Sequence, residues 1–222
     1  MQMWELLRNK HPLHEPVWHV QSAMLVAIIL QFSLPDRLLF GSRYVLVAVE
    51  FLLLVSLSFT TPREKIFRSL TRRLNVLLLV GFSGLANCYG LVVVAKTLLQ
   101  SGSVANGRDL ILSAVNIYLT NIIIFGLFYW EMDGGGPGAR AKAPKHAQDF
   151  LFPQSQNQDF QHPDWQPTFI DYVYVSSTNA MAFSPTDTLP LSRRAKLLML
   201  FQATVSLVTI ALVAARAVNI LH

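Results

Sequence analysis

The sequence predicts an all-α polytopic membrane protein with five transmembrane helices and a re-entrant or interfacial half-helix before the last one. Composition gives the first indication, because 52% of the 222 residues are hydrophobic and only 14% are charged. Ordinary soluble domains carry about 25% charged residues. The second indication is that five apolar segments come close to or exceed the roughly 20 residues that a helix needs to cross a bilayer.

The five apolar segments follow one another along the chain and end at residues that stop helices. They cover residues 17–34, 38–60, 74–99, 110–130 and 195–221. Pro35 and Pro62 end the first two, because proline cannot donate a helical hydrogen bond. Asp109 is placed to cap the fourth. Cys88 is the single cysteine and lies in the third segment, so an intrachain disulfide is excluded.

Composition divides the chain into three regions. Residues 1–131 hold the first four apolar segments, and residues 168–222 hold a short aromatic segment and the last helix. The polar stretch between them, residues 132–167, is rich in Gly and Pro and is expected to be a flexible loop. Thr168–Phe183 is too short and too polar to span a bilayer, which indicates a re-entrant or interfacial half-helix.

Basic residues predict the orientation of the segments. If all five segments span, most Lys and Arg residues fall on the side that carries the N-terminus and the long loop. The positive-inside bias then places both in the cytoplasm. The net charge of +5 suits anionic lipid headgroups. No basic-aromatic groove pattern suggests nucleic-acid binding, so the lipid bilayer is the expected partner.

The stretch "DYVYVSSTNAMAFSPTD" (171–187) combines aromatic residues, hydroxyl residues and a carboxylate just before the last apolar segment. Together with that segment it resembles the pore-loop and inner-helix unit of potassium channels. "AFSPTD" (182–187) stands in the place of the selectivity filter, and Asp187 and Pro190 match the filter pattern. The resemblance implies a homo-oligomeric channel for inorganic ions.

The filter itself departs from the potassium-channel pattern. The Gly-Tyr-Gly positions hold Ser184, Pro185 and Thr186, and only glycine readily adopts the dihedrals of a carbonyl-lined filter. A ring of side chains would then select cations instead. The candidate pore residues are Thr178, Asn179, Ala182, Phe183, Ser184, Pro185, Thr186, Asp187 and Thr188. The alternative is structural: "SPTD" is a helix start with Ser184 as its cap, and Ser192 caps the last helix.

Three further motifs are spread along much of the chain, from residue 61 to residue 196. They are "TPREKIFRSLTRR" (61–73), "FLFP" (150–153) and "FIDYVYVSSTNAMAFSPTDTLPLSRRAK" (169–196). Their order and character resemble segments of a family of uncharacterised bacterial integral membrane proteins. That resemblance implies a helical membrane fold and no particular activity.

A second candidate site consists of polar residues inside the apolar segments. They are Glu50, Asn87, Asn116, Thr120, Gln202 and Ser206. An intramembrane carboxyl group is costly and marks a functional or paired site, and a polar stripe must face protein or water. These residues could form the midplane site of a transporter. Alternatively, they make interhelical hydrogen bonds that stabilise the bundle.

Three classes of function remain open. Enzyme signatures such as a phosphate-binding glycine loop, GxSxG or HExxH are absent from the sequence, and no cofactor or metal site is predicted. The leading hypothesis is an oligomeric, channel-like protein with a cation pathway at residues 182–187. The alternatives are a secondary transporter component with a midplane polar site, and a non-conducting structural or regulatory protein whose loop, residues 132–192, binds a partner.

Overall fold

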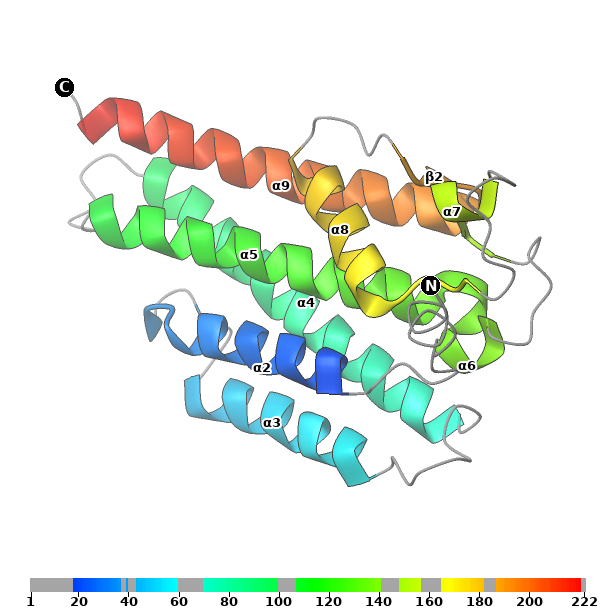
Figure 1. The fold of residues 1–222 in the computed structure, drawn as a ribbon. Coiled ribbons are helices and arrows are strands. Elements are labelled where there is room, and N and C mark those ends of the chain that lie inside the picture. The colour runs from blue at the N-terminus through cyan, green and yellow to red at the C-terminus, as the bar shows by residue number, and fades with distance from the viewer. Residues whose placement is uncertain are drawn as a thin grey trace, which may run out of the picture.

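The computed structural model describes residues 18–36, 39, 43–59, 70–99, 107–140, 148–156, 165–181 and 187–220. Long helices dominate this part of the chain and pack side by side as a bundle (Figure 1). They are α2 (Trp18–Phe32), α3 (Arg43–Phe59), α4 (Leu70–Leu99), α5 (Gly107–Met132), α8 (Phe169–Ala180) and α9 (Arg193–Ile220). The predicted all-α class is therefore confirmed for the described residues.

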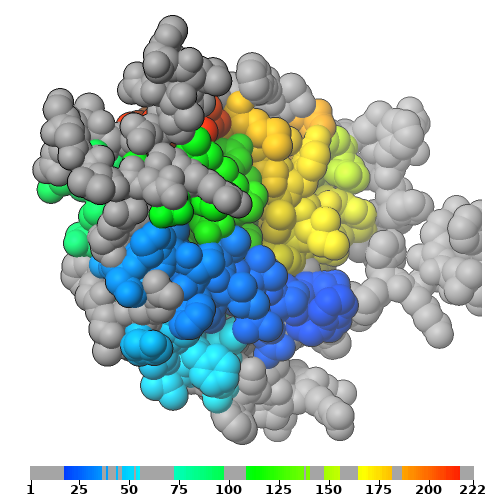
Figure 2. All heavy atoms as spheres, turned by 90° about the vertical axis from the view of Figure 1, so that its left-hand side faces the viewer, coloured from blue at the N-terminus to red at the C-terminus, as the bar shows by residue number. Residues whose placement is uncertain are grey.

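Helix α5 occupies the middle of the bundle. It packs against α2, α4, α8 and α9, whereas α3 lies on the far side and packs against α2 and α4. Figure 2 shows α2, in blue, between the cyan surface of α3 and the green surface of α5. The polar residues of α5 therefore have neighbours on several sides.

One end of the bundle, here named the loop end, carries the shorter elements. They are η3 (Asp133–Gly135), α6 (Pro137–Arg140), β1 (Phe150–Leu151), α7 (Pro153–Gln156) and β2 (Leu189–Pro190). The two strands pair antiparallel, with Phe150 opposite Pro190 and Leu151 opposite Leu189. Helix α5 ends and helix α9 begins at this end (Figure 1). The other end of the bundle is named the opposite end.

Three of the described helices are long and apolar enough to cross a membrane. The spans are Arg73–Thr97, Asp109–Gly135 and Arg193–Ala215, which is compatible with an integral membrane protein. Helices α2 and α3 have 15 and 17 residues, fewer than the roughly 20 that a span needs. The structure thus supports three spans by length and composition, and crossing by α2 and α3 stays a prediction.

A short helix, α8, lies where the half-helix before the last span was predicted, and its re-entrant or interfacial position stays a prediction. A capping box starts it, in which the backbone N–H of Thr168 donates to Oδ2 of Asp171 at 2.7 Å. Gly126 of α5 lies beneath it, and a Cβ there would come within 3.2 Å of the Cα of Val173. Glycine at this position therefore allows α8 to approach the backbone of α5 closely.

Two predicted caps have different outcomes. Ser192 caps α9 as predicted, because its Oγ accepts a hydrogen bond from the Ala195 N–H at 3.1 Å. The prediction for Asp109 is wrong, since α5 begins two residues earlier at Gly107 and Asp109 lies inside the first turn. A carboxylate in the first turn still interacts favourably with the helix dipole.

The predicted flexible loop differs from expectation where it is described. Asp133, Arg140 and Asp149 are buried, and Gly134–Gly136 turn the chain with positive φ angles of 59°, 87° and 94°. This turn brings Arg140 back to the end of α5, where its Nη1 donates to the carbonyl oxygens of Trp130 and Asp133, both at 3.0 Å. A cation at a helix C-terminus satisfies free carbonyl groups and suits the helix dipole.

Candidate functional site

Two separate hydrophobic clusters make up the core of the described bundle. The loop-end cluster includes Met24 and Ile28 of α2, Val76, Leu79 and Val80 of α4, and Ile124 and Phe125 of α5. The opposite-end cluster consists of Leu34, Leu39, Leu91, Val94, Ile117 and Val205. Along α4 and α5, buried polar residues lie between members of the two clusters.

Buried polar side chains separate the two clusters, and we name this set the polar layer. On α4, Val80 belongs to the loop-end cluster, Ser83 and Asn87 follow, and Leu91 belongs to the opposite-end cluster. The members of the polar layer are Gln31, Glu50, Ser83, Asn87, Thr120, Asn121 and Ser206, all buried. Four of the six sequence-predicted intramembrane candidates, Glu50, Asn87, Thr120 and Ser206, thus lie in the polar layer.

Glu50 is the charged member of the polar layer and is fully buried. Ser83 of α4 donates its hydroxyl to Oε1 of Glu50. The amide of Gln31, from α2, lies against the same carboxyl group, and its nitrogen donates to Oε1 of Glu50 at 2.8 Å and to Oε2 at 2.9 Å. Side chains from α2, α3 and α4 therefore meet at one carboxyl group.

No basic side chain compensates Glu50 within the described part of the chain. Its described partners are the neutral groups of Ser83 and Gln31. On α4, Arg73 lies 10 residues before Ser83 and the exposed Lys96 lies 13 residues beyond it, or about 15 and 20 Å along a helix. A buried carboxylate without a cation is energetically costly and is retained mainly where its charge is used.

Asn87 continues the polar layer toward the opposite end. Its Nδ2 donates to the carbonyl oxygen of Ile117 on α5 at 3.0 Å. Its Oδ1 is buried and has no hydrogen-bond partner among the described groups. A buried amide oxygen left unpaired costs about 1–3 kcal/mol, so this atom is placed to accept from a water molecule or from a ligand.

Asn121 and Ser206 of the polar layer tie α5 to α9, because Asn121 donates to Oγ of Ser206 at 2.9 Å. Outside the layer, the predicted candidate Asn116 donates to Oγ of Ser33 at 2.7 Å in an exposed position. Thr209 is buried and donates to the carbonyl oxygen of Val205 in its own helix. These contacts are interhelical or local hydrogen bonds of the kind that stabilise bundles.

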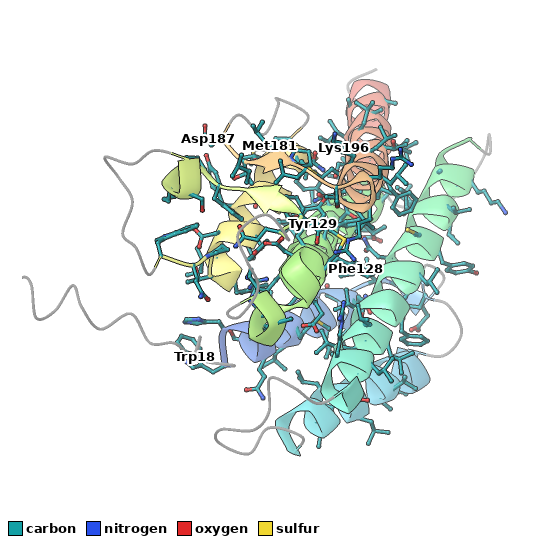
Figure 3. All side chains as sticks on the ribbon, turned by 90° about the vertical axis from the view of Figure 1, so that its right-hand side faces the viewer. Trp18, Phe128, Tyr129, Met181, Asp187 and Lys196 are labelled. Carbon is teal, nitrogen blue, oxygen red and sulfur yellow. The ribbon has the colours of Figure 1, made fainter. Side chains whose placement is uncertain are left out.

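A second buried polar network seats α8 against α5 and α9. Oε1 of Gln202 accepts from the Tyr129 hydroxyl and from Asn179 Nδ2, the latter at 2.9 Å. Its Nε2 donates to the carbonyl oxygen and Oγ of Ser176 at 2.9 and 2.7 Å. Figure 3 shows Tyr129 within the bundle between the surrounding helices. Protein groups thus engage both ends of the Gln202 amide and the Nδ2 of Asn179, two predicted site residues.

The predicted pore residues do not converge in the part of the chain that is described. Thr178 donates to the carbonyl oxygens of its own helix, and Thr188 is buried. Asp187 is exposed and accepts from the Tyr174 hydroxyl at 3.3 Å; in Figure 3 it lies at the outer edge, away from Tyr129. Ala182, Phe183, Ser184, Pro185 and Thr186 fall outside the described residues.

A cluster at the loop end was not predicted from the sequence. We name it the anchor cluster, and its members are Asp133, Asp149, Tyr172 and Arg194. Asp133 Oδ1 accepts from the backbone N–H groups of Asp149 and Phe150, and its Oδ2 accepts from the Tyr172 hydroxyl. Burial holds the pKa of the Tyr172 phenol well above its usual value, so the hydroxyl stays protonated and donates. All the oxygens of this buried carboxylate therefore have donors.

Asp149 completes the anchor cluster through Arg194. The guanidinium donates Nε to Oδ1 at 2.7 Å and Nη2 to Oδ2 at 2.8 Å, a bidentate pair. The Gly134 N–H donates to Oδ2 at 3.2 Å. Burial acts to raise the pKa of Asp149, but the hydrogen bonds from Arg194, Ser192 and Gly134 outweigh it and hold that pKa below its usual value. The cluster fastens the returning loop to the first turn of α9.

The Glu50 site and the anchor cluster thus bury carboxylates in different surroundings, and neutral hydrogen bonds seat the short helix α8. No group of three or more His, Cys, Asp or Glu side chains in the described ranges has the arrangement of a metal site. Comparison adds no relative to this picture: no known protein family, no curated protein and no solved structure matches the chain.

Proposed function

We propose that the protein is a secondary transporter component in which the polar layer binds the transported or coupled cation and Glu50 is the binding group. The observation that carries the proposal is the burial of the Glu50 carboxyl group among α2, α3 and α4 with neutral hydrogen-bond partners. A purely structural role would be served better by an uncharged side chain, because a buried charge without a counter-charge destabilises a fold.

The arrangement of the core supports the same proposal. Hydrophobic clusters lie on both sides of the polar layer, so an ion at Glu50 would be shut off from water at both ends. Secondary transporters place their sites near the bilayer midplane and open them to one side at a time. The proposal includes crossing of the membrane by α2 and α3, with the N-terminus in the cytoplasm of a bacterial cell.

The channel-like hypothesis remains as a second proposal. What supports it is the seating of α8 against α9 by buried hydrogen bonds from Gln202 to Ser176 and Asn179, as a pore helix needs a rigid support. Asp187 near the end of α8 is exposed. In a homo-oligomer it could meet its copies around an axis and attract cations.

One flux experiment separates the two proposals. The purified protein is placed in liposomes with an imposed proton, sodium or potassium gradient, and flux is followed for wild type, Glu50→Gln and Asp187→Asn. The carrier proposal expects Glu50→Gln to lower flux roughly tenfold or more, since the carboxyl group binds the ion, while Asp187→Asn retains it. The reverse pattern would favour the pore loop. Absence of flux with any gradient would leave a structural or regulatory role.

A further inference from the structure

We propose that α8 is a re-entrant half-helix that enters the membrane from the loop end, reaches the middle of the bilayer and holds its outward face against lipid acyl chains. The sequence left open whether this segment is re-entrant or interfacial, and its contacts along α5 and α9 favour the first. The position of α8 follows from membrane crossing by α5 and α9, which their length and composition allow. It is independent of any ion bound at Glu50.

Helix α8 descends along α5 almost residue for residue. Three successive contacts, from the loop end inward, join Phe169 to Trp130, Val173 to Gly126 and Ser176 to Ile122. The last of them is a hydrogen bond of 2.7 Å from Oγ of Ser176 to the Ile122 carbonyl oxygen. The partners on α5 thus move inward by eight residues, or about 12 Å. Figure 1 shows α8, in yellow, running obliquely from the loop end toward the middle of α9.

The inner end of this contact lies at the middle of the α5 span. That span is Asp109–Gly135, and Ile122 lies 13 residues from either end of it, or about 20 Å along a helix. On α9, Nε2 of Gln202 donates to Oγ of Ser176 at 2.7 Å. Gln202 lies nine residues beyond Arg193, where that span begins, or about 14 Å. Both long helices therefore place Ser176 about halfway through a hydrocarbon core of roughly 30 Å.

The chain that follows α8 is back at the loop end by Leu189. Strand β2 pairs with β1 there, and the Leu191 N–H donates to the Asp149 carbonyl oxygen at 2.8 Å. Eight residues lead from Met181 to Leu189, which can span up to about 26 Å, more than the depth of α8. A helix of 12 residues is too short to cross a bilayer. Entry and exit at the same end, with a deep tip, define a re-entrant segment.

Protein groups satisfy three polar side chains in the inner half of α8, as the interior of a membrane requires. Ser176 bonds to α5 and α9, and Asn179 donates to the Met199 carbonyl oxygen and to Gln202 on α9. Thr178 donates to carbonyl oxygens of its own helix. The carboxylate of Asp171 lies in the first turn, at the loop end. A helix lying flat among headgroups would instead turn a polar face to water.

The outward face of α8 is largely apolar. Ile170, Tyr174 and Met181 are 64%, 54% and 51% exposed, and steps of four and seven residues put them on one face of a helix. The Tyr174 hydroxyl donates to Asp187 at 3.3 Å, which lies two residues before β2 and hence within about 7 Å of the loop end. Toward Met181 the face lies at membrane depth, where the surrounding medium is lipid and water is absent.

Spin labels placed along the outward face test the proposal in lipid vesicles. In a Cys88→Ser background, Ile170→Cys, Tyr174→Cys and Met181→Cys are each labelled with a nitroxide. Collisions with oxygen, which concentrates in the bilayer, and with a water-soluble nickel chelate then give the depth of each label.

Two exposed positions calibrate the depth scale when they carry the same label. Leu85 lies midway along the Arg73–Thr97 span of α4, and Leu189 lies in β2 at the loop end. The label at Met181 should match the depth of the label at Leu85, and the label at Ile170 should match that at Leu189. Because eleven residues separate Ile170 from Met181, the expected difference in depth is about 10–16 Å, with the third label between them.

Three outcomes would overturn the proposal. Equal, shallow depths for the three labels would show an interfacial helix. A label at Met181 that collides more with the nickel chelate than with oxygen would place this face in water. Labels at Tyr174 and Met181 that are shielded from both reagents and broadened by labels on neighbouring copies would show that a second copy covers the face. That last result would favour the channel-like proposal.

A photoreactive lipid tests the unmodified protein, should the Cys88→Ser background not fold. A carbene formed at the end of an acyl chain should attach to Met181 at least several-fold more often than to Ile170, as mass spectrometry of the peptides would show. Equal labelling, or the reverse order, would overturn the proposal. Absence of ion flux in liposomes would alter neither experiment, so the position of α8 and the transporter proposal can fail separately.

Discussion

The anchor cluster and the Glu50 site are two ways of burying a carboxylate in one bundle. In the anchor cluster, Asp133 has backbone and phenol donors and Asp149 has a bidentate arginine. At Glu50 the partners are a serine hydroxyl and an amide, both neutral. A buried carboxylate with an arginine or a full set of donors fixes structure, whereas one held only by two neutral side chains keeps a negative charge that a cation could neutralise. The position of each site agrees with this difference, since one fastens a loop and the other lies between two hydrophobic clusters.

The largest expected effect tests the structural side of this comparison. Asp133→Ala would leave two backbone N–H groups and the Tyr172 hydroxyl without their acceptor. We expect the free energy of unfolding to fall by about 3–5 kcal/mol, measured by thermal or denaturant unfolding in detergent. The exposed variant Asp187→Asn is the control and should change it by less than about 0.5 kcal/mol. An equally small effect of Asp133→Ala would show that the anchor cluster does not hold the loop.

The next effect depends on pH. Because the pKa of Asp149 is lowered in the folded state, its stabilisation is fully present above the unfolded pKa of about 3.9 and is lost as the pH falls through the folded value. Asp149→Asn should therefore destabilise the protein at neutral pH by about 1–3 kcal/mol, since Arg194 is partly exposed. The difference from wild type should shrink below about pH 4. A difference independent of pH would argue against the ion pair as its source.

A smaller effect is expected in the neutral network that seats α8. Ser176 donates to the Ile122 carbonyl oxygen at 2.7 Å and accepts from Gln202. Ser176→Ala should cost about 1 kcal/mol, the usual value of a hydrogen bond inside a helical membrane protein. Thr204→Ala is a matched control, because its hydroxyl donates only to its own helix in an exposed position. Equal unfolding curves for the two variants would remove the network as a source of stability.

The smallest effect on stability is expected at the site with the largest proposed effect on function. Glu50→Gln keeps the shape of the side chain and removes the charge, so the free energy of unfolding should change by less than about 1 kcal/mol at neutral pH. Flux should nevertheless fall sharply. A strong loss of stability in this variant would place Glu50 with the anchor cluster as a structural carboxylate.

Sequence patterns anticipated the long helices because apolar runs and helix-stopping residues are local signals. Helix α2 lies within one or two residues of its predicted bounds, and Ser192 was identified as a cap. Helix α3 begins at Arg43, five residues after the predicted start. Such local signals give the length of a helix and leave open whether α2 and α3 cross a bilayer.

The sites were harder to predict because they depend on contacts between distant segments. Glu50 and Asn87 stood out as polar residues in apolar runs, but their neighbours did not: Gln31 lies at the end of its segment and Ser83 resembles an ordinary small packing residue. Asp133 and Asp149 lie in a Gly- and Pro-rich stretch that indicates a loop. They meet only in the folded chain, where the Asp149 N–H donates to Oδ1 of Asp133.

The place of the polar layer between two hydrophobic clusters has an electrical consequence. A unit charge that crosses a membrane potential of 100 mV changes in free energy by about 2.3 kcal/mol. If Glu50 lies halfway across a bilayer, as the transporter proposal requires, a monovalent cation that binds there passes through about half of that drop, or about 1.2 kcal/mol. A change of 100 mV would then alter the cation occupancy of Glu50 roughly sevenfold at a constant cation concentration. The response to voltage would come from one bound ion at a carboxyl group and not from charges fixed on a moving helix.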